Sequence, residues 1–177
     1  STDRPEFAAA EKAVNDKIKR LMSIQGKESV DTIHKRLGLV MWDFVGMGRT
    51  AESLKTAIQK IDEIKKDFWT NVYIPGTADS LNNELEKALR LADFIEIGRL
   101  MAVDALNREE SCGGHFREEY QTEEGEALRQ DDKFSYVACW KYMGEDKEPE
   151  LIKEPLDYEF TERKTRKIGR ASCRERV

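Results

Sequence analysis

The chain has few cysteines, no long apolar run and no excess of positive charge. Its 177 residues include 3 cysteines, and so small and odd a number of thiols favours a reducing compartment over a disulfide framework. No apolar segment approaches the roughly 20 residues that span a bilayer. The formal net charge is −5, which gives no general reason to expect nucleic acid or an anionic membrane as a partner. This composition is typical of a soluble, mildly acidic protein with one domain, or one domain and an appendage.

The two ends of the chain suggest that it is part of something longer. Ser1 is not a start methionine, so we expect a fragment of a larger protein. Residues 168–177 can be back-translated into a string that resembles read-through into a common sequencing adapter, and we interpret them as a non-native tail. The alternative is a genuine basic tail. In either case, the basic residues from Arg163 onward are weak evidence for nucleic-acid binding.

Four stretches with helical periodicity fill residues 1–108. The expected caps and breaks are, in chain order, Thr2–Asp3 before Pro5, Gly26, Ser29, Gly46–Gly48, Thr50, Pro75–Gly76 and Asp79 or Ser80. The apolar stripes are Phe7, Ala10, Val14, Ile18 and Leu21; Ile33, Leu37, Val40, Met41 and Phe44; Leu54, Ala57, Ile61, Ile64 and Phe68; and Leu81, Leu85, Leu89, Ala92, Ile95 and Val103. Amphipathic helices must bury their stripes against one another. We therefore predict a mainly α fold, an antiparallel bundle of three or four helices that resembles a spectrin repeat.

Residues 109–167 follow a different pattern. Residues 121–133 are polar and expected to be irregular. From Phe134 to Tyr142, alternate residues are large or apolar, which predicts a strand with Phe134, Tyr136, Ala138, Trp140 and Tyr142 on one face. A turn over Gly144–Pro149 and a return strand over Glu150–Phe160 complete a hairpin. Because a lone hairpin is marginal in water, it should pack on the bundle or on a missing domain.

A polar turn joins these two parts. It brings a thiol, an imidazole, a guanidinium and carboxylates around two adjacent glycines, which allow the chain to turn sharply. Such a segment is either a site or a docking surface, and we interpret it as a docking turn. Its residues are Glu110, Ser111, Cys112, Gly113, Gly114, His115, Arg117, Glu119 and Tyr120.

Several motifs suggest chemistry but also have a structural interpretation. Gly46–Ala51 matches G-x-G-x-x-A, yet helical spacing precedes it where a dinucleotide site needs a strand, so we expect a turn between helices. Cys112 and His115 lack a second ligand pair for zinc. A Cys–His nucleophile is possible on residue type alone, but we expect His115 to be a hydrogen-bonded structural residue and His34 to lie on a helix surface. The three tryptophans, Trp42, Trp69 and Trp140, are interpreted as packing residues.

The order of these features resembles the C-terminal part of the flavoprotein subunit of succinate dehydrogenase and fumarate reductase. The resemblance covers about residues 1–167. It begins with Met41-Trp42-x-x-Val45-Gly46-x-x-Arg49, continues through the helices, and reaches Arg108-Glu-Glu110-Ser. The family pattern at the turn is Glu-Ser-Arg-Gly-x-His-x-Arg-x-Asp-Tyr/Phe. The chain matches it at Glu110, Ser111, Gly113, His115, Arg117 and Tyr120. It departs at Cys112, where arginine is usual, and at Glu119, where aspartate is usual.

The resemblance implies an enzyme that interconverts succinate and fumarate with covalently held FAD. Electrons would pass to an iron–sulfur subunit and a membrane anchor, at the inner face of the cytoplasmic membrane. The family's FAD site and catalytic residues precede this segment, so the resemblance assigns no catalytic, cofactor or metal residue here. We therefore expect an inactive structural module: a bundle over 1–108, a docking tail over 109–167 and the tail over 168–177. The docking turn and the hairpin would contact the FAD-binding domain of the same subunit.

Two other interpretations remain open. L-Aspartate oxidase resembles the same family and shares both the helical module and the Ser-x-Gly-x-His turn. A free-standing helical interaction module would explain the bundle and the charge, but not the polar turn followed by an aromatic hairpin.

Overall fold

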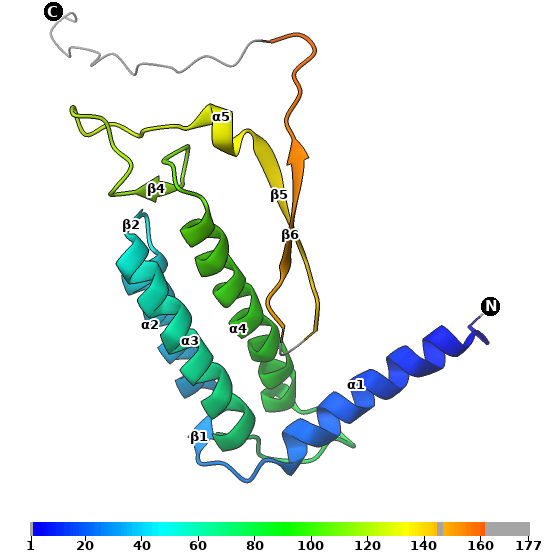
Figure 1. Ribbon diagram of the computed structural model, residues 1–177. Coiled ribbons are helices and arrows are strands. Elements are labelled where there is room, and N and C mark those ends of the chain that lie inside the picture. Colours follow the sequence, from blue (N-terminus) through cyan, green and yellow to red (C-terminus); the bar gives the residue numbers. More distant parts are fainter. Residues whose placement is uncertain (1, 145–146, 162–177) are drawn as a thin grey trace, which may run out of the picture.

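The computed structural model describes residues 2–144 and 147–161; the tail predicted at residues 168–177 lies outside them. Four long helices come first in the chain, and a hairpin follows them (Figure 1). The helices are α1 (Pro5–Ser23), α2 (Val30–Val45), α3 (Ala51–Asn71), α4 (Asn83–Asn107) and the single turn α5 (Asp131–Phe134). The strands are β1 (Glu28–Ser29), β2 (Gly48–Arg49), β3 (Val72–Tyr73), β4 (Phe116–Arg117), β5 (Tyr136–Lys141) and β6 (Glu150–Pro155).

Helices α2, α3 and α4 form an antiparallel bundle, which confirms the predicted fold class (Figure 1). Ser29 caps α2 by accepting the Thr32 N–H, and Thr50 caps α3 in a capping box with Ser53. Both caps are local in sequence, which is why they could be predicted. The predicted stripes of α2 and α3 provide most of the core on those helices. Its fully buried centre consists of Leu21, Ile33, Leu54, Ala57, Ile61, Phe68, Val72, Ala88 and Ala102.

The predicted burial of the first stripe is only half right. Leu21 is buried and Ile18 packs against the core, but residues 5–16 are all exposed. Phe7 and Val14 keep 53% and 55% of their surface exposed. The reason is geometric. Only the C-terminal end of α1 contacts α4, and the N-terminal half points away from the bundle (Figure 1).

Two predicted helix starts are also corrected. Helix α4 begins at Asn83 rather than near Asp79 or Ser80, because the Asn82 side chain accepts the backbone N–H groups of Glu84 and Leu85. Leu81 therefore lies before the helix and is 96% exposed. At α1 the N-cap position is Arg4, and no side chain caps it.

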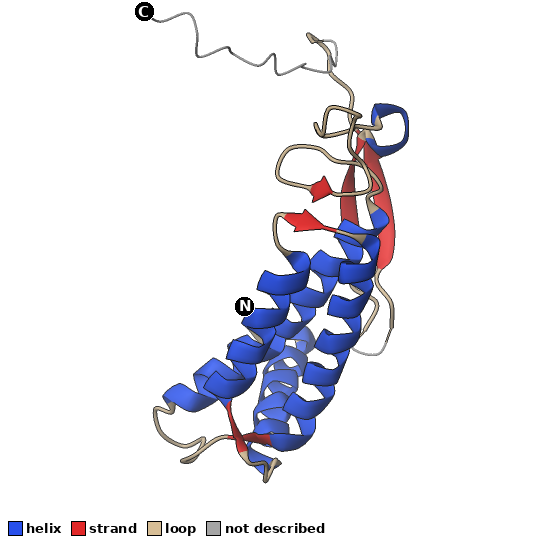
Figure 2. Ribbon diagram, turned by 90° about the vertical axis from the view of Figure 1, so that its left-hand side faces the viewer, coloured by secondary structure: helices blue, strands red, loops and turns tan. Residues whose placement is uncertain are grey.

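Two short parallel strand pairs hold the ends of the bundle together. β1 pairs with β3 at one end, and β2 pairs with β4 at the other, where α2 and α4 finish (Figure 2). Beside β1, the backbone of Gly26 approaches Asn71 so closely that an added β-carbon would lie 1.9 Å from the Asn71 carbonyl carbon. Gly26 is thus required for chain approach as well as for ending a helix.

The hairpin lies along α4, so within the described residues it packs on the bundle (Figure 1). Strand β5 pairs antiparallel with β6, from Tyr136 opposite Pro155 to Lys141 opposite Glu150. Trp140 donates from Nε1 to the Asp104 carboxylate of α4 at 2.7 Å. The strands are shorter than predicted, since Phe134 belongs to α5 and β6 ends at Pro155.

Among the described residues, no helix is both long and apolar enough to cross a bilayer.

Candidate functional site

The docking turn closes on itself through its own backbone. The Cys112 N–H donates to the His115 carbonyl at 2.8 Å, and the His115 N–H donates back to the Cys112 carbonyl at 3.1 Å. Gly113 takes a left-handed φ of +59°, whereas Gly114 is not among the glycines with positive φ. Only Gly113 therefore needs the freedom of glycine at this turn.

Arg117 clamps the turn onto the end of α4. It is the largest fully buried side chain of the described residues, with 2% of its surface exposed. Its Nη1 donates to the carbonyl of Ala105 at 2.9 Å and to that of Leu106 at 3.2 Å. These are carbonyls of the last helical turn, which lack partners within the helix and carry the negative end of its dipole. A buried cation is thus placed where a helix end stabilises it.

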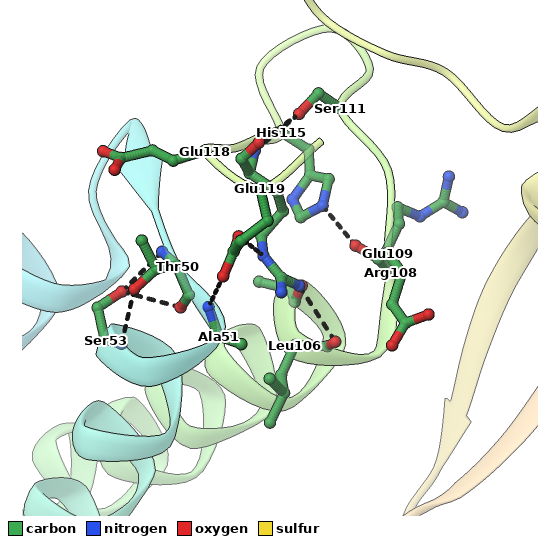
Figure 3. A network of polar contacts seen from close by, with 12 residues as sticks. Thr50, Ala51, Ser53, Leu106, Arg108, Glu109, Ser111, His115, Glu118 and Glu119 are labelled. Carbon is green, nitrogen blue, oxygen red and sulfur yellow. Dashed lines mark hydrogen bonds and ion pairs between the residues drawn. The ribbon is translucent and has the colours of Figure 1, made fainter. Parts of the chain in front are cut away.

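Glu119 extends this clamp to the start of α3. One carboxylate oxygen accepts from Arg117 Nε at 3.1 Å, and the other accepts the Ala51 N–H, 68 residues away in sequence (Figure 3). Burial alone would raise the pKa of Glu119, but the hydrogen bonds from the Ala51 and Glu119 backbone and from Arg117 outweigh it and hold the pKa below its usual range. One ion pair therefore links the negative end of α4 to the positive end of α3.

Ser111 fixes the strand of the turn that carries Arg117. The hydroxyl is fully buried, accepts the Arg117 N–H at 2.8 Å and donates to the Arg117 carbonyl at 3.0 Å. Both backbone groups of one residue are thus satisfied by one side chain. Replacing such a buried hydroxyl removes this acceptor from the Arg117 N–H, whereas the Arg117 carbonyl keeps the Tyr120 N–H at 2.9 Å.

Glu110 and Arg108 connect the turn to the hairpin. Glu110 is 2% exposed; its carboxylate accepts from Arg108 Nη1 at 2.7 Å and from the Gln130 N–H at 2.9 Å. Arg108 in turn donates from Nη2 to the Tyr136 carbonyl at 3.1 Å, at the start of β5. The first glutamate of the turn therefore positions the hairpin rather than facing outward.

His115 is half-buried and hydrogen-bonded, as predicted. Its Nε2 lies 2.9 Å from the Arg108 carbonyl, an oxygen that can only accept, so Nε2 carries the proton (Figure 3). Burial lowers the pKa of His115, and the positive charges of Arg49, Arg117 and Arg108 lower it further, against the opposing effect of that hydrogen bond. The imidazole is therefore neutral at pH 7 and holds the turn onto the end of α4. The other histidine, His34, lies exposed on α2, also as predicted.

Arg49 is a member of this network that the residue pattern alone did not indicate. β2 pairs with β4 so that Arg49 lies opposite Arg117, and the Glu118 N–H donates to the Arg49 carbonyl at 3.0 Å. The Arg49 Nη2 reaches the Gly114 carbonyl at 3.5 Å. Its buried Nε has no hydrogen-bond partner within the described part of the chain. The signal that could have found it is its place in the family motif after Gly46.

The structure thus brings together most residues of the docking turn. Glu110, Ser111, His115, Arg117 and Glu119 converge on the ends of α3 and α4, and the Tyr120 ring lies under the Arg117 guanidinium at 5.3 Å. Cys112 contributes only backbone hydrogen bonds to the closure of the turn. Over the described ranges, no three His, Cys, Asp or Glu side chains are arranged to hold a metal ion. The network therefore fixes the ends of helices and leaves Gly113 and Gly114 exposed; we call these two residues the glycine edge.

Two sequence interpretations of other motifs are decided by the fold. Gly46–Gly48 follows α2, so the glycine pattern is a turn between helices as expected. The interpretation of Trp42 as a packing residue is wrong, because 82% of its surface is exposed on the outer face of α2. Trp69 does pack against the core, where the Arg20 guanidinium lies 3.9 Å from its ring centre.

Comparison with known proteins agrees with this architecture. The chain matches the family described as "Fumarate reductase flavoprotein C-term" over residues 34–168. It is 33% identical to the fumarate reductase flavoprotein subunit of Proteus vulgaris over 59% of this chain and 17% of that protein. It is 26% identical to the succinate dehydrogenase flavoprotein subunit of Bacillus subtilis over 85% of this chain and 25% of that protein.

A solved structure shares the fold. The chain superposes on quinol fumarate reductase of E. coli with a TM-score of 0.77 and 24% identity, over 92% of this chain and 27% of that one. The chain therefore spans between a sixth and about a quarter of the relatives that it matches. On the family match, which covers most of its length, it belongs to the C-terminal domain family of the fumarate reductase and succinate dehydrogenase flavoproteins.

Proposed function

We propose that this chain is the docking module of a flavoprotein that interconverts succinate and fumarate. The flavin would be held by the preceding part of the longer protein, and the chain alone would be inactive. The helical bundle domain would span 1–108, and the tail over 109–167 would carry the docking turn. The family match supports this assignment, and proteins that the chain is similar to include flavoprotein subunits named fumarate reductase and succinate dehydrogenase.

The observation that carries the docking role is the direction in which the polar groups of the turn point. Arg117, Ser111 and Glu110 are buried and form hydrogen bonds within the module, so their side chains hold the turn in place. Between Glu110 and Tyr120, the exposed residues are Gly113, Gly114, Glu118 and Glu119. An edge without β-carbons lets another backbone approach closely. The exposed backbone of Gly113 and Gly114, held from behind by this polar network, is suited to contact with a neighbouring domain.

FAD does not fit the described residues of this chain. A dinucleotide needs a free helix N-terminus after a glycine turn that follows a strand. Here the glycine turn follows α2, and the first N–H of α3 is already bound by Glu119. Thr50 and Ser53 also cap that helix start. No step of flavin chemistry is therefore assigned to these residues.

The partners of the proposed enzyme follow from its class. The first is the FAD-binding domain of the same subunit, which the docking turn and hairpin would contact. An iron–sulfur subunit would receive the electrons, and a membrane anchor would bind indirectly, at the inner face of the cytoplasmic membrane. No nucleic acid is expected as a partner, since the formal net charge of the chain is −5.

The test uses the full-length flavoprotein with His115→Ala, and compares turnover per bound flavin with stability. If His115 only holds the turn, melting temperature or flavin retention falls, because the Arg108 carbonyl loses its partner, while turnover per bound flavin stays near its original value. A catalytic acid or base would lose about 10²–10⁴-fold in rate. A collapse of that size in a protein with normal melting and full flavin content contradicts the docking role.

The isolated chain provides the second arm. After incubation with FAD and desalting, it should show neither flavin absorbance nor succinate-dependent dye reduction. Stoichiometric yellow protein, or any turnover, would overturn the proposal that the flavin site lies elsewhere.

A further inference from the structure

The first twelve residues of α1 form a helix that touches none of the bundle core. All residues from 5 to 16 are exposed, although Phe7, Ala10 and Val14 continue the stripe that buries Leu21. Isolated helices of about 12 residues are marginal in water even for good helix formers. A bare apolar stripe on such a helix indicates a surface that something else covers.

Other exposed apolar side chains border the same side of the module. Ile97 on α4 is 54% exposed, and Tyr142 at the tip of the hairpin is 70% exposed. Between them lies a recess of about 270 Å³, lined also by Trp69, Ala92 and Lys17 of α1. In Figure 1, α1 leaves the bundle at this point and runs out on the side where the hairpin covers α4. We call this surface, from Phe7 along α1 to Ile97 and Tyr142, the α1 recess.

The charged residues that line the recess are paired within the chain. Lys17 donates to Asp93 at 3.0 Å, and Glu96 pairs with Lys65 at 2.6 Å. A charged small molecule would have to displace these pairs. An apolar protein surface would not, and it would bury the stripe of α1 at a gain of about 25 cal/mol per Å² of apolar area.

We propose that the α1 recess is the seat of the polypeptide that precedes this module, so that the flavin domain contacts the module at two places. This rests on the proposed function. The matched relatives are about four to six times longer than the aligned part, and α1 is the first element of this chain. A domain joined at the start of α1 meets the recess at an effective concentration in the millimolar range, so a small apolar contact suffices.

The size of such a domain allows both contacts. Helix α4, with 25 residues, separates the α1 recess from the docking turn by roughly 37 Å at 1.5 Å per residue. A domain of about 400 residues has a radius of gyration near 21 Å, so its diameter exceeds that separation. One partner can therefore reach from the bare stripe to the glycine edge.

Hydrogen exchange over residues 5–16 tests the proposal in the full-length flavoprotein and in the isolated chain. We expect these amides to exchange at least about 10-fold more slowly in the full-length protein. Equal exchange in both overturns the inference. So does protection that appears in the isolated chain as its concentration rises, which would assign the surface to a second copy. Protection that requires an added iron–sulfur subunit would assign it to that partner and equally overturns the inference.

A matched pair of variants separates a docking role from general helix effects. Ala10→Asp places a charge on the stripe, whereas Ala9→Asp places the same charge about 100° away around the same exposed helix. Ala10→Asp should remove most of the protection in the full-length protein and Ala9→Asp should not, while in the isolated chain the two should melt alike. If the two variants show equal hydrogen-exchange protection over residues 5–16 in the full-length protein, the proposal is contradicted.

Flavin content and succinate turnover, measured on the same preparation, keep this test apart from the proposed function. A full-length protein without flavin would overturn the proposed function. A flavin-loaded, active protein with unprotected residues 5–16 would overturn only the α1 recess.

Discussion

The docking turn and the first half of α1 reverse the usual relation between polarity and burial. The turn is rich in charge, yet Glu110 and Arg117 are each 2% exposed. The start of α1 carries a regular apolar stripe, yet Phe7 is 53% exposed. The difference lies in what each segment contacts. The turn contacts two helix ends whose unpaired backbone groups need charged partners, while residues 5–16 of α1 are exposed throughout. Burial follows the available partner more than the composition of the segment.

The strongest test of this difference removes one side chain from each region and compares the losses of stability. Arg117→Ala should lower the free energy of unfolding of the isolated chain by about 3 kcal/mol, because the Ala105 and Leu106 carbonyls and the Glu119 carboxylate lose their partner. Phe7→Ala should change it by less than about 0.5 kcal/mol, since an exposed residue away from caps and networks contributes little. Urea unfolding measures both. A larger loss for Phe7→Ala would contradict the comparison.

Substitutions at the two neighbouring glycines test whether positive φ makes glycine necessary in the turn. Gly113→Ala should cost about 1–2 kcal/mol, because a β-carbon is strained at φ +59° although open space surrounds it. Gly114→Ala, equally open but without positive φ, is the matched control and should cost less than about 0.5 kcal/mol. Thermal or urea melts of the two proteins decide the point. Equal losses would show that strain at Gly113 is not the cause.

A smaller effect is expected at the link to α3. Glu119→Ala removes the acceptor of the Ala51 N–H and the ion-pair partner of Arg117, at a cost of about 1 kcal/mol. Glu118→Ala, one residue earlier and exposed, controls for loss of a carboxylate from the same strand. If the two variants unfold at the same urea concentration, the cap supplied by Glu119 contributes nothing measurable.

The smallest expected effect is a pH dependence carried by His115. Because its pKa is lowered in the folded protein, the unfolded chain binds the proton more readily, so stability falls as the pH drops below the ordinary value near 6.5. The free energy of unfolding should therefore decrease more between pH 7.5 and 5.5 in the original protein than in His115→Gln. The paired carboxylate of Glu119 acts separately, since its lowered pKa costs stability only below about pH 4.5. His34→Gln is the control; a slope that changes with His34 rather than His115 would contradict the assignment.

What the sequence determined by itself was local. The caps at Ser29 and Thr50 and the stripes of α2 and α3 were predicted correctly, since a cap uses atoms within three residues and a stripe needs only the helical period. The alternation of β5 likewise placed Tyr136 and Trp140 on the inner face. Predictions that required only neighbours along the chain succeeded.

The tertiary structure decided everything that depended on a distant surface. The sequence marked Arg117 and Glu119 as important, but their partners are helix ends that only the bundle brings to them. It marked the stripe of α1 and Trp42 as packing surfaces, yet Phe7, Val14 and Trp42 remain exposed. Leu81 was assigned to a helix that the side chain of Asn82 starts two residues later. The physical reason is common to all of these: periodicity says which residues share a face, whereas burial requires another surface placed against that face.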